Sequence, residues 1–521
     1  MNTKLLQPFT ARVGMGETVV AAGADSERRR WAVLLICCMS LLVVGVDVTA
    51  VNVALPSIGR GLHAGIDGLQ WSIDAYSVVL ASLLIFGGSL GDRLGRKPVF
   101  MTGLVLFLAG SALCSVASSV GMLIAFRALQ AIGGSMLNPV AMAIITNSFT
   151  DPRERAQAVG IWAATFGLSM ALGPIVGGAL VSGGGWRAIF LLNVPVCLAA
   201  LALTAGFVPN SRAPHPRRVD PAGQLLMMTM TASLTYAIIE LPAHGLRSPA
   251  TGGAFLLALA SLIALLLVEP RRREPLLDLR FFRSVPFAAA IVIVIVATAA
   301  FGGFLFLNTL YLQDARGLSP LQAGLATLPL AVVMALVAPV SGRVVGRRGP
   351  RLPLLISGVA YTLACAMLAS LRAHTSLSYL LVSYALLGLG FGAVNAPVTN
   401  TAVSGMPRAQ AGVAAATAST SRQFGQTIGV ALAGAMVNAG AGHILPARLA
   451  SDTHPVWILL AGWGALIFAL GLIATSGRAR ASAERVAKEL NPEALANTLA
   501  PNGSRATTAG TRTIRFRGAR H

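Results

Sequence analysis

The sequence predicts an all-α integral membrane protein, and three observations lead to this fold class. Hydrophobic residues make up 55% of the 521 residues and charged residues only 11%, whereas soluble domains contain about 45–50% and about 25% respectively. The mean hydropathy is +0.72. Apolar segments of about 20 residues, the length that crosses a bilayer, recur along the chain. Together they exclude a soluble enzyme, a secreted disulfide scaffold and a disordered chain.

Fourteen apolar segments are predicted to span the membrane as helices. A polar segment, 1–30, precedes the first, which continues for more than twenty residues without a small-residue cleavage site and is therefore predicted to be an uncleaved helix. Eight spans are expected before a basic break and six after it: 31–54, 71–91, 98–118, 121–146, 156–181, 188–208, 222–241 and 250–269, then 285–313, 321–345, 352–371, 376–404, 411–439 and 456–475.

The basic residues predict the orientation of these spans. The net charge is +21, from 40 Lys and Arg against 19 Asp and Glu. Of the 40, 32 lie in the loops and terminal segments that the span order assigns to one side, six lie on the other side, and two, Arg127 and Arg422, fall inside spans. Because cytoplasmic flanks collect Lys and Arg, both termini are predicted to be cytoplasmic in a multi-pass protein of the cell membrane.

The basic tail, 476–521, is predicted to be a disordered cytoplasmic extension near anionic lipid. No nucleic-acid partner is expected, because the tail has a single aromatic residue, Phe516, and no folded scaffold.

Two charged residues inside predicted spans are candidates for function, because such charges are costly in lipid. Asp47 lies in the first span and Arg127 in the fourth; Asn52 and Gln130 follow them with further polar atoms. One interpretation is a structural ion pair that holds two helices together. The other is a titrating carboxylate that lines a cavity and is tuned by Arg127.

A second candidate cluster lies near the outer end of the second span, where Asp74 is flanked by Trp71 and Tyr76. An acidic and aromatic setting suits a lipophilic cation, yet Trp and Tyr are also common at membrane interfaces. Both interpretations remain open from the sequence.

Two stretches match enzyme sequence motifs but lack the structural context that those motifs require. The stretch GGSLG at 87–91 lacks the strand that a nucleophile elbow requires, and GLGFGA at 388–393 lies inside a span. All five cysteines lie in apolar segments without disulfide or zinc spacing. No catalytic residues, metal site or cofactor are therefore expected.

The stretch GGSLGDRLGRK at 87–97, between the second and third spans, resembles the signature of the major facilitator superfamily at the same position. SGRVVGRRGPR at 341–351 is a weaker version of it in the second half. The resemblance implies a six-helix half at 31–208, a linker with two extra spans at 209–284 and a second six-helix half at 285–475. This arrangement is similar to the fourteen-span drug:proton antiporters, which export quaternary ammonium compounds and antibiotics.

Further stretches resemble this branch of the family. VDVTAVNVALP at 46–56 is similar to the motif that contains the proton-linked Asp, here Asp47. RALQAIGGS at 127–135 matches the fourth-span motif through Arg127, although Ala131 replaces the usual Gly. GLSMALGPIVGG at 167–178 matches the antiporter motif, and GWRAIFLLNVP at 185–195 and TSRQFGQTIGVA at 420–431 are also typical of the family.

The resemblance assigns the candidate residues to four roles. Proton coupling falls to Asp47 and Arg127, and the substrate cavity to Asp74, Tyr76, Asn52 and Gln130. A gating loop that closes the cytoplasmic side would contain Gly88, Gly91, Asp92, Arg93, Gly95 and Arg96. The antiporter motif would form a hinge, because Pro removes a backbone hydrogen bond and Gly permits close helix approach; ordinary Gly packing is the alternative. Its residues are Gly167, Gly173, Pro174, Gly177 and Gly178.

The expected function is proton-coupled multidrug or antibiotic efflux, in which a monomer in the membrane exports small amphipathic, drug-like molecules that are cationic or neutral. Export of an endogenous metabolite is one alternative. A non-transporting membrane sensor or assembly protein is another, although such a protein would be expected to lose its buried charges.

Overall fold

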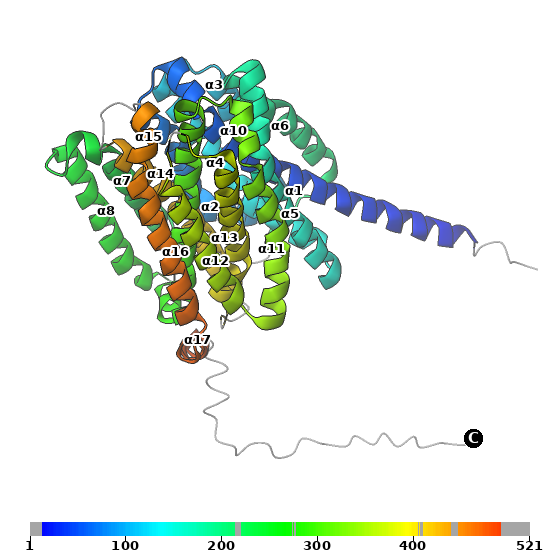
Figure 1. Ribbon diagram of the computed structural model, residues 1–521. Helices are drawn as coiled ribbons and strands as arrows, with labels where there is room; N and C mark the ends of the chain where they lie inside the picture. The colour runs from blue at the N-terminus through cyan, green and yellow to red at the C-terminus, as the bar shows by residue number, and fades with distance from the viewer. Residues whose placement is uncertain are drawn as a thin grey trace, which may run out of the picture.

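The computed structural model describes residues 13–213, 220–272, 275, 278–372, 374–404, 406, 410–438 and 446–490. Within these ranges the regular structure is entirely helical, which confirms the predicted class (Figure 1). The amino-terminal half consists of α1 Val13–Leu62, α2 Ile66–Leu94, α3 Arg96–Ser115, α4 Val120–Ser148, α5 Pro152–Gly184 and α6 Arg187–Phe207.

Two further helices, α7 Pro221–His244 and α8 Pro249–Val268, form the insertion. They pack against each other, and α7 also contacts α2 and α14. Figure 1 shows them along one edge of the bundle. Two short 3₁₀ turns, η1 Glu269–Arg271 and η2 Leu279–Arg283, lead to the next helix.

The carboxy-terminal half begins with the deeply buried α9 Val285–Leu310, which ends in a π-helical turn, η3 Tyr311–Ala315. The remaining helices are α10 Pro320–Ala326, α11 Leu328–Arg348, α12 Arg351–Leu368, α13 Leu377–Val403, α14 Ala411–Asn438, α15 Pro446–Asp452, α16 His454–Ala474 and α17 Gly477–Leu490.

Local signals set several helix boundaries. The carboxylate of Asp151 accepts hydrogen bonds from the backbone N–H groups of Arg153 and Glu154, with Pro152 in the first turn of α5. The expected span 321–345 lies within a single candidate membrane span, Pro320–Arg348, in which the α-helix is interrupted at Thr327 between α10 and α11. Pro329 in the first turn of α11 accounts for the interruption, since proline lacks the N–H that would donate to the carbonyl oxygen of Leu325 in a continuous helix.

Helix extends beyond the predicted spans at both ends of the chain. The described part of segment 1–30 is helical from Val13 onward and continuous with the first span. The tail is likewise helical over Gly477–Leu490, where Ala479, Ala483, Val486 and Leu490 form a buried apolar face. Disorder was therefore wrong for this part of the tail, and 491–521 lies outside the described residues.

Thirteen helical stretches in the described ranges are long and apolar enough to cross a membrane, so the chain is a multi-pass membrane protein. One of the fourteen predicted spans, 411–439, corresponds to α14 (Ala411–Asn438), which is not among the thirteen. Its Thr, Ser, Gln and Arg side chains lower its hydropathy. The helix nevertheless packs along α9 and α2 within the bundle.

The two ends of the bundle differ in charge and in how the halves meet. One end, here called the basic end, carries the turns between α2 and α3 and between α11 and α12, with Arg93, Arg96, Arg347, Arg348 and Arg351. The opposite end carries the α1–α2 turn.

Polar contacts join the two halves at the opposite end. The side-chain amide of Gln70 in α2 donates to the carbonyl oxygens of Val430 and Ala431 in α14, at 3.2 and 2.9 Å. Gln313 donates to the carbonyl oxygen of Val53 at 2.7 Å. In the basic half of α5, by contrast, exposed positions occur on several faces of the helix. The structure is therefore closed at the opposite end.

Candidate functional site

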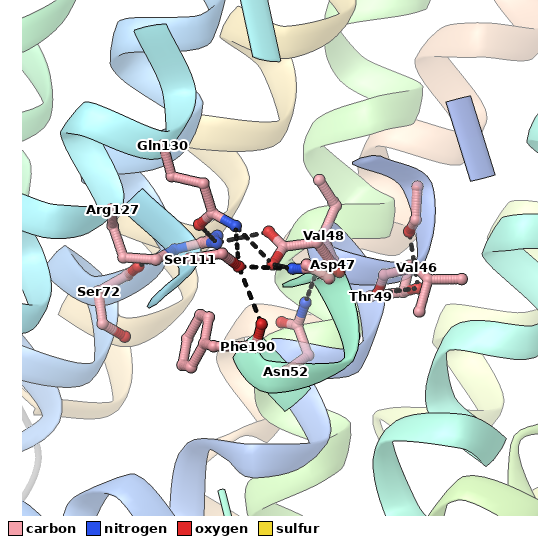
Figure 2. A network of polar contacts seen from close by, with 12 residues as sticks. Val46, Asp47, Val48, Thr49, Asn52, Ser72, Ser111, Arg127, Gln130 and Phe190 are labelled. Carbon is pink, nitrogen blue, oxygen red and sulfur yellow. Dashed lines mark hydrogen bonds and ion pairs between the residues drawn. The ribbon is translucent and has the colours of Figure 1, made fainter. Parts of the chain in front are cut away.

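A buried polar network surrounds Asp47 in the middle of the amino-terminal half (Figure 2). One carboxylate oxygen of Asp47 accepts from Arg127 of α4 at 2.5 Å. The other accepts from the side-chain amides of Gln130 in α4 and Asn193 in α6, at 3.0 and 2.9 Å. Asp47 has no exposed surface. Three donors from α4 and α6 thus bind both carboxylate oxygens of Asp47 on α1.

The guanidinium of Arg127 is held from several sides. Beyond the ion pair, its Nη1 donates to Gln130 Oε1 at 2.7 Å and its Nε to the carbonyl oxygen of Ser72 in α2 at 3.2 Å. Its Cζ lies 4.2 Å from the ring centroid of Tyr76, close enough for a cation–π interaction. Because Arg127 is only 2% exposed, the cation depends on these contacts in place of water.

Two members of this network were not predicted from the sequence. Ser111 of α3 accepts from Gln130 at 3.1 Å and from Asn193 at 2.9 Å, and it donates to the carbonyl oxygen of Phe190 at 3.1 Å. The position of Asn193 offered a signal, because an amide inside an apolar span is costly unless it is bonded. Ser111 offered none, since a serine can bond to its own helix.

The predicted substrate residues do not form one cluster. Gln130 and Tyr76 belong to the Asp47 network, while the amide nitrogen of Asn52 donates to Val48 of its own helix at 2.8 Å. Asp74 is completely buried on α2, and neither of its carboxylate oxygens has a hydrogen-bond partner among the described residues. The neighbouring Trp71 packs instead against Tyr236 of α7, with ring centroids 6.1 Å apart.

The predicted gating loop is mostly helical, which corrects the expectation of a loop. Gly88 and Gly91 lie within α2 against α4, where an added Cβ would meet Pro139 at 3.2 Å and Val140 at 2.7 Å. Close packing on α4 explains why the helix continues here; it ends with Arg93 in its last turn. The turn itself is at Gly95, whose φ of +114° favours glycine.

The contacts of Asp92 and Arg96 in the gating segment lie within the amino-terminal part of the chain. Asp92 pairs with Arg96 at 3.1 Å, and Arg96 also donates to the carbonyl oxygen of Ala143 at 3.2 Å. The carbonyl oxygen of Asp92 accepts from the N–H of Ala213 at 3.2 Å. In this conformation these groups bind locally.

The antiporter motif brings α5 into close contact with both halves. An added Cβ at Gly173 would collide with Thr49 of α1, and one at Gly177 would lie 2.8 Å from the Cα of Ala50. Gly178 faces the other half, where a Cβ would lie 2.5 Å from the carbonyl oxygen of Pro320 in α10.

The same contact continues in the other direction. A Cβ at Gly324 of α10 would collide with the carbonyl oxygen of Pro174. Gly167 has no neighbour within 4 Å and lies outside this contact. The structure thus places four of the five motif residues at the junction between α1, α5 and α10.

Metal-binding chemistry has no counterpart in these surroundings. Within the described ranges, no three His, Cys, Asp or Glu side chains come together as metal ligands would.

Curated proteins with export and resistance functions are similar to this chain over most of its length. The tetracenomycin C resistance and export protein of Streptomyces glaucescens is 35% identical over 82% of this chain and 79% of its own. The multidrug efflux pump LfrA of Mycolicibacterium smegmatis is 34% identical over 79% and 81%. The methylenomycin A resistance protein of Bacillus subtilis is 32% identical over 82% and 94%.

Solved transporter structures share the fold at low sequence identity. A bacterial homologue of the human lysosomal transporter Spinster, in an inward-facing and unoccupied conformation, matches with a TM-score of 0.58 at 19% identity, over 89% of this chain and 98% of its own. A POT family transporter in complex with 5-aminolevulinic acid matches with a TM-score of 0.64 at 16% identity, over 86% and 97%. The family model of the Major Facilitator Superfamily matches residues 37–430. With the all-helical fold and this match over most of the sequence, the chain belongs to the major facilitator superfamily.

Proposed function

We propose that this protein is a proton-coupled secondary exporter that removes small amphipathic, drug-like molecules from the cytoplasm. The proposal rests on one observation, the fully buried ion pair between Asp47 and Arg127. A chain that only needed the fold would not require such a costly pair. The relatives named as efflux and resistance proteins support export as the direction of transport.

The geometry around Asp47 suggests how a proton would act. All three donors to this carboxylate come from other helices, α4 and α6. A proton that binds the oxygen facing Arg127 would compete with the guanidinium for the same lone pairs, because Arg carries only donors. Protonation would therefore loosen α1 from α4, and release of the proton would restore the pair. Competition between the proton and Arg127 for the carboxylate of Asp47 would couple proton binding to the position of α1 relative to α4.

The orientation follows from the charges. With the basic end in the cytoplasm, both termini are cytoplasmic and the closed opposite end faces the outside. The conformation described above is then the one in which the two halves are joined on the outer side. Alternating access would break the contacts of Gln70 and Gln313 and close the basic end. Asp92 would then be free to approach the other half, as a gate requires.

The remaining features of the proposal follow the sequence. We place fourteen spans in the cell membrane, with α14 counted despite its polar residues because it lies along α9 and α2. The protein would act as a monomer on small molecules in contact with membrane lipid. Its partners would be protons and substrate, without a cofactor or nucleic acid.

Transport in everted membrane vesicles tests the proposal. Vesicles from an efflux-deficient host that express the protein should take up amphipathic antibiotics and dyes, screened as a panel, only while a proton gradient exists. The Asp47→Asn variant should lose this uptake, and Asp67→Asn, the same change at an exposed position of α2, should retain it.

Three outcomes would refute parts of this proposal. Uptake that persists after a protonophore removes the gradient would exclude proton coupling. A parent protein that behaves like empty vesicles for every compound would favour the non-transporting sensor. Uptake of one endogenous metabolite alone would favour a dedicated exporter.

A further inference from the structure

The carboxy-terminal half contains a second intramembrane arginine, Arg422 of α14, that the mechanism above does not use. It lies eleven residues from the start of the helix at Ala411, about 16 Å along its axis. Val430, which accepts a hydrogen bond from Gln70 in the closure at the opposite end, lies eight residues further, about 12 Å away. Arg422 thus lies on α14 between the contacts that close the opposite end and the basic end.

The contacts of Arg422 leave its charge unneutralised. Its Nη2 donates to the hydroxyl of Thr399 in α13 at 3.4 Å, a long bond to a neutral acceptor. Its Nε is buried and makes no hydrogen bond. Among the described residues, no Asp or Glu forms an ion pair with it, in contrast to Arg127, which is paired with Asp47.

Further polar residues occur near Thr399 and Arg422 along α13 and α14. On α13, Thr399 and Asn400 are exposed and Asn395 is half-buried one turn away. On α14, Arg422 itself is half-buried, as is Gln426 one turn further. We call these five residues the α13–α14 polar strip. Thr399 and Asn395 also donate to carbonyl oxygens of their own helix, at 3.0 and 3.1 Å. The exposed amide of Asn400 cannot face lipid hydrocarbon at low cost, which favours a strip that faces water at the basic end.

The carboxylates of the bundle interior are not accessible in the same way. Asp47 is enclosed by its three donors, and Asp74 is completely buried on α2. A molecule that enters from the basic end therefore meets a positive charge first. A guanidinium with free donors is the group that proteins use to bind carboxylates and other oxyanions.

We infer that Arg422 binds an ionised acidic group, a carboxylate or a similar oxyanion, on the molecule that this protein exports. The polar strip would orient that group, and the apolar body of the molecule would lie along the surrounding helices. This inference rests on the proposed function, whose substrate class it narrows to amphipathic organic acids. The other source of an oxyanion is a phospholipid headgroup, which the experiment separates.

Binding to the purified protein in a neutral detergent tests the inference without a gradient. Two fluorescent probes form a matched pair: rhodamine 110, which carries a free carboxyl group, and rhodamine 123, its methyl ester. By fluorescence anisotropy the parent should bind the acid about ten-fold more tightly than the ester, the size expected for a charge-assisted hydrogen bond. Equal binding, or none of the acid, would overturn the inference.

Variants assign the effect to the guanidinium. Arg422→Gln should weaken binding of the acid about ten-fold and leave the ester unchanged, and Arg422→Lys should retain part of the preference. Arg343→Gln, at an exposed position of α11, is the charge-matched control and should behave like the parent. An acid affinity that is unchanged in Arg422→Gln would overturn the inference.

A second variant keeps the arginine and guards against a folding defect. Thr399→Asp places a carboxylate at the residue to which Arg422 already donates, so it should block the acid probe while the ester still binds. Acid binding that survives in this variant would count against the site.

Titration with phosphatidylglycerol separates the two sources of the oxyanion. The partner is a headgroup, and the inference fails, if two results occur together. Phosphatidylglycerol changes the anisotropy of the bound probe in the parent but not in Arg422→Gln, and the affinity for the acid probe is the same in both proteins.

Failure of this inference can be distinguished from failure of the proposed function. A parent that binds the acid through Arg422 but transports nothing would keep the inference and refute export. Proton-driven uptake with the same acid-to-ester preference in the parent and in Arg422→Gln would refute the inference alone.

Discussion

The ion pair between Asp47 and Arg127 permits a quantitative prediction, because both partners are buried and their contacts are known. Asp47→Asn keeps the shape of the side chain but removes the negative charge opposite Arg127, which is 2% exposed. Removing one partner of a buried pair typically costs about 3–5 kcal/mol, since the other charge is left without compensation. We expect a loss of this size in the free energy of unfolding.

A double-variant cycle isolates the pair. Arg127→Gln alone should also destabilise the protein, whereas the double variant contains two neutral amides that can bond to each other. The double variant should therefore be more stable than the sum of the single losses predicts, by about 1–3 kcal/mol. Denaturant titration in mixed micelles, followed by circular dichroism, measures the four free energies.

The stability cycle is combined with a transport assay. The double variant should recover stability but not substrate-driven proton movement in vesicles, because an amide cannot carry a proton. Additive losses, or an Asp47→Asn cost below about 1 kcal/mol, would contradict the buried pair. Substrate-driven pH changes of parental size in Asp47→Asn would refute its coupling role while leaving the structural pair intact.

Three further predictions concern other sites. Asp74→Leu should raise the free energy of unfolding by about 1–3 kcal/mol in denaturant titration, because it replaces a buried carboxyl without partners; a lower stability would imply an unseen partner. Gly177→Leu places a side chain 2.8 Å from the Cα of Ala50 and should slow uptake in vesicles, while Gly167→Leu, which has open space, should not; equal rates would argue against a hinge. Gln70→Leu removes two hydrogen bonds to α14, about 0.5–1.5 kcal/mol each, and should increase cross-linker access at the opposite end; unchanged access would mean that other contacts hold this closure.

Much of the fold could be predicted because each spanning helix satisfies its own backbone hydrogen bonds. A span therefore has a local signature of length and hydropathy, and each of the fourteen predicted segments is helical over most of its described length. Pro329 interrupts one span between α10 and α11 without dividing it in two. The error lies in the tail, where the alternation of Ala479, Ala483 and Val486 with charged residues formed α17 instead of the expected disorder.

The candidate site could be predicted only in part. Asp47, Arg127 and Gln130 were identifiable because polar groups are rare and costly inside spans. The same reasoning would have included Asn193, but nothing in the sequence marks Ser111 as the acceptor that links the two amides. Grouping Asp74 with Tyr76 followed from their proximity along α2. Yet residues two apart on a helix point to different sides, and only Tyr76 reaches Arg127.

By itself, the sequence determined that this chain crosses a membrane many times, that its basic residues concentrate in alternate loops, and which few charged residues fall inside its spans. These properties depend on transfer of each segment between water and lipid, a quantity that is summed residue by residue. Only the tertiary structure decided that Asp47 is enclosed by donors 80, 83 and 146 residues away. It also decided that the halves meet at the opposite end, and that Arg422 has no acidic partner in the described chain. These outcomes depend on which helix faces pack together, and no local segment carries that information.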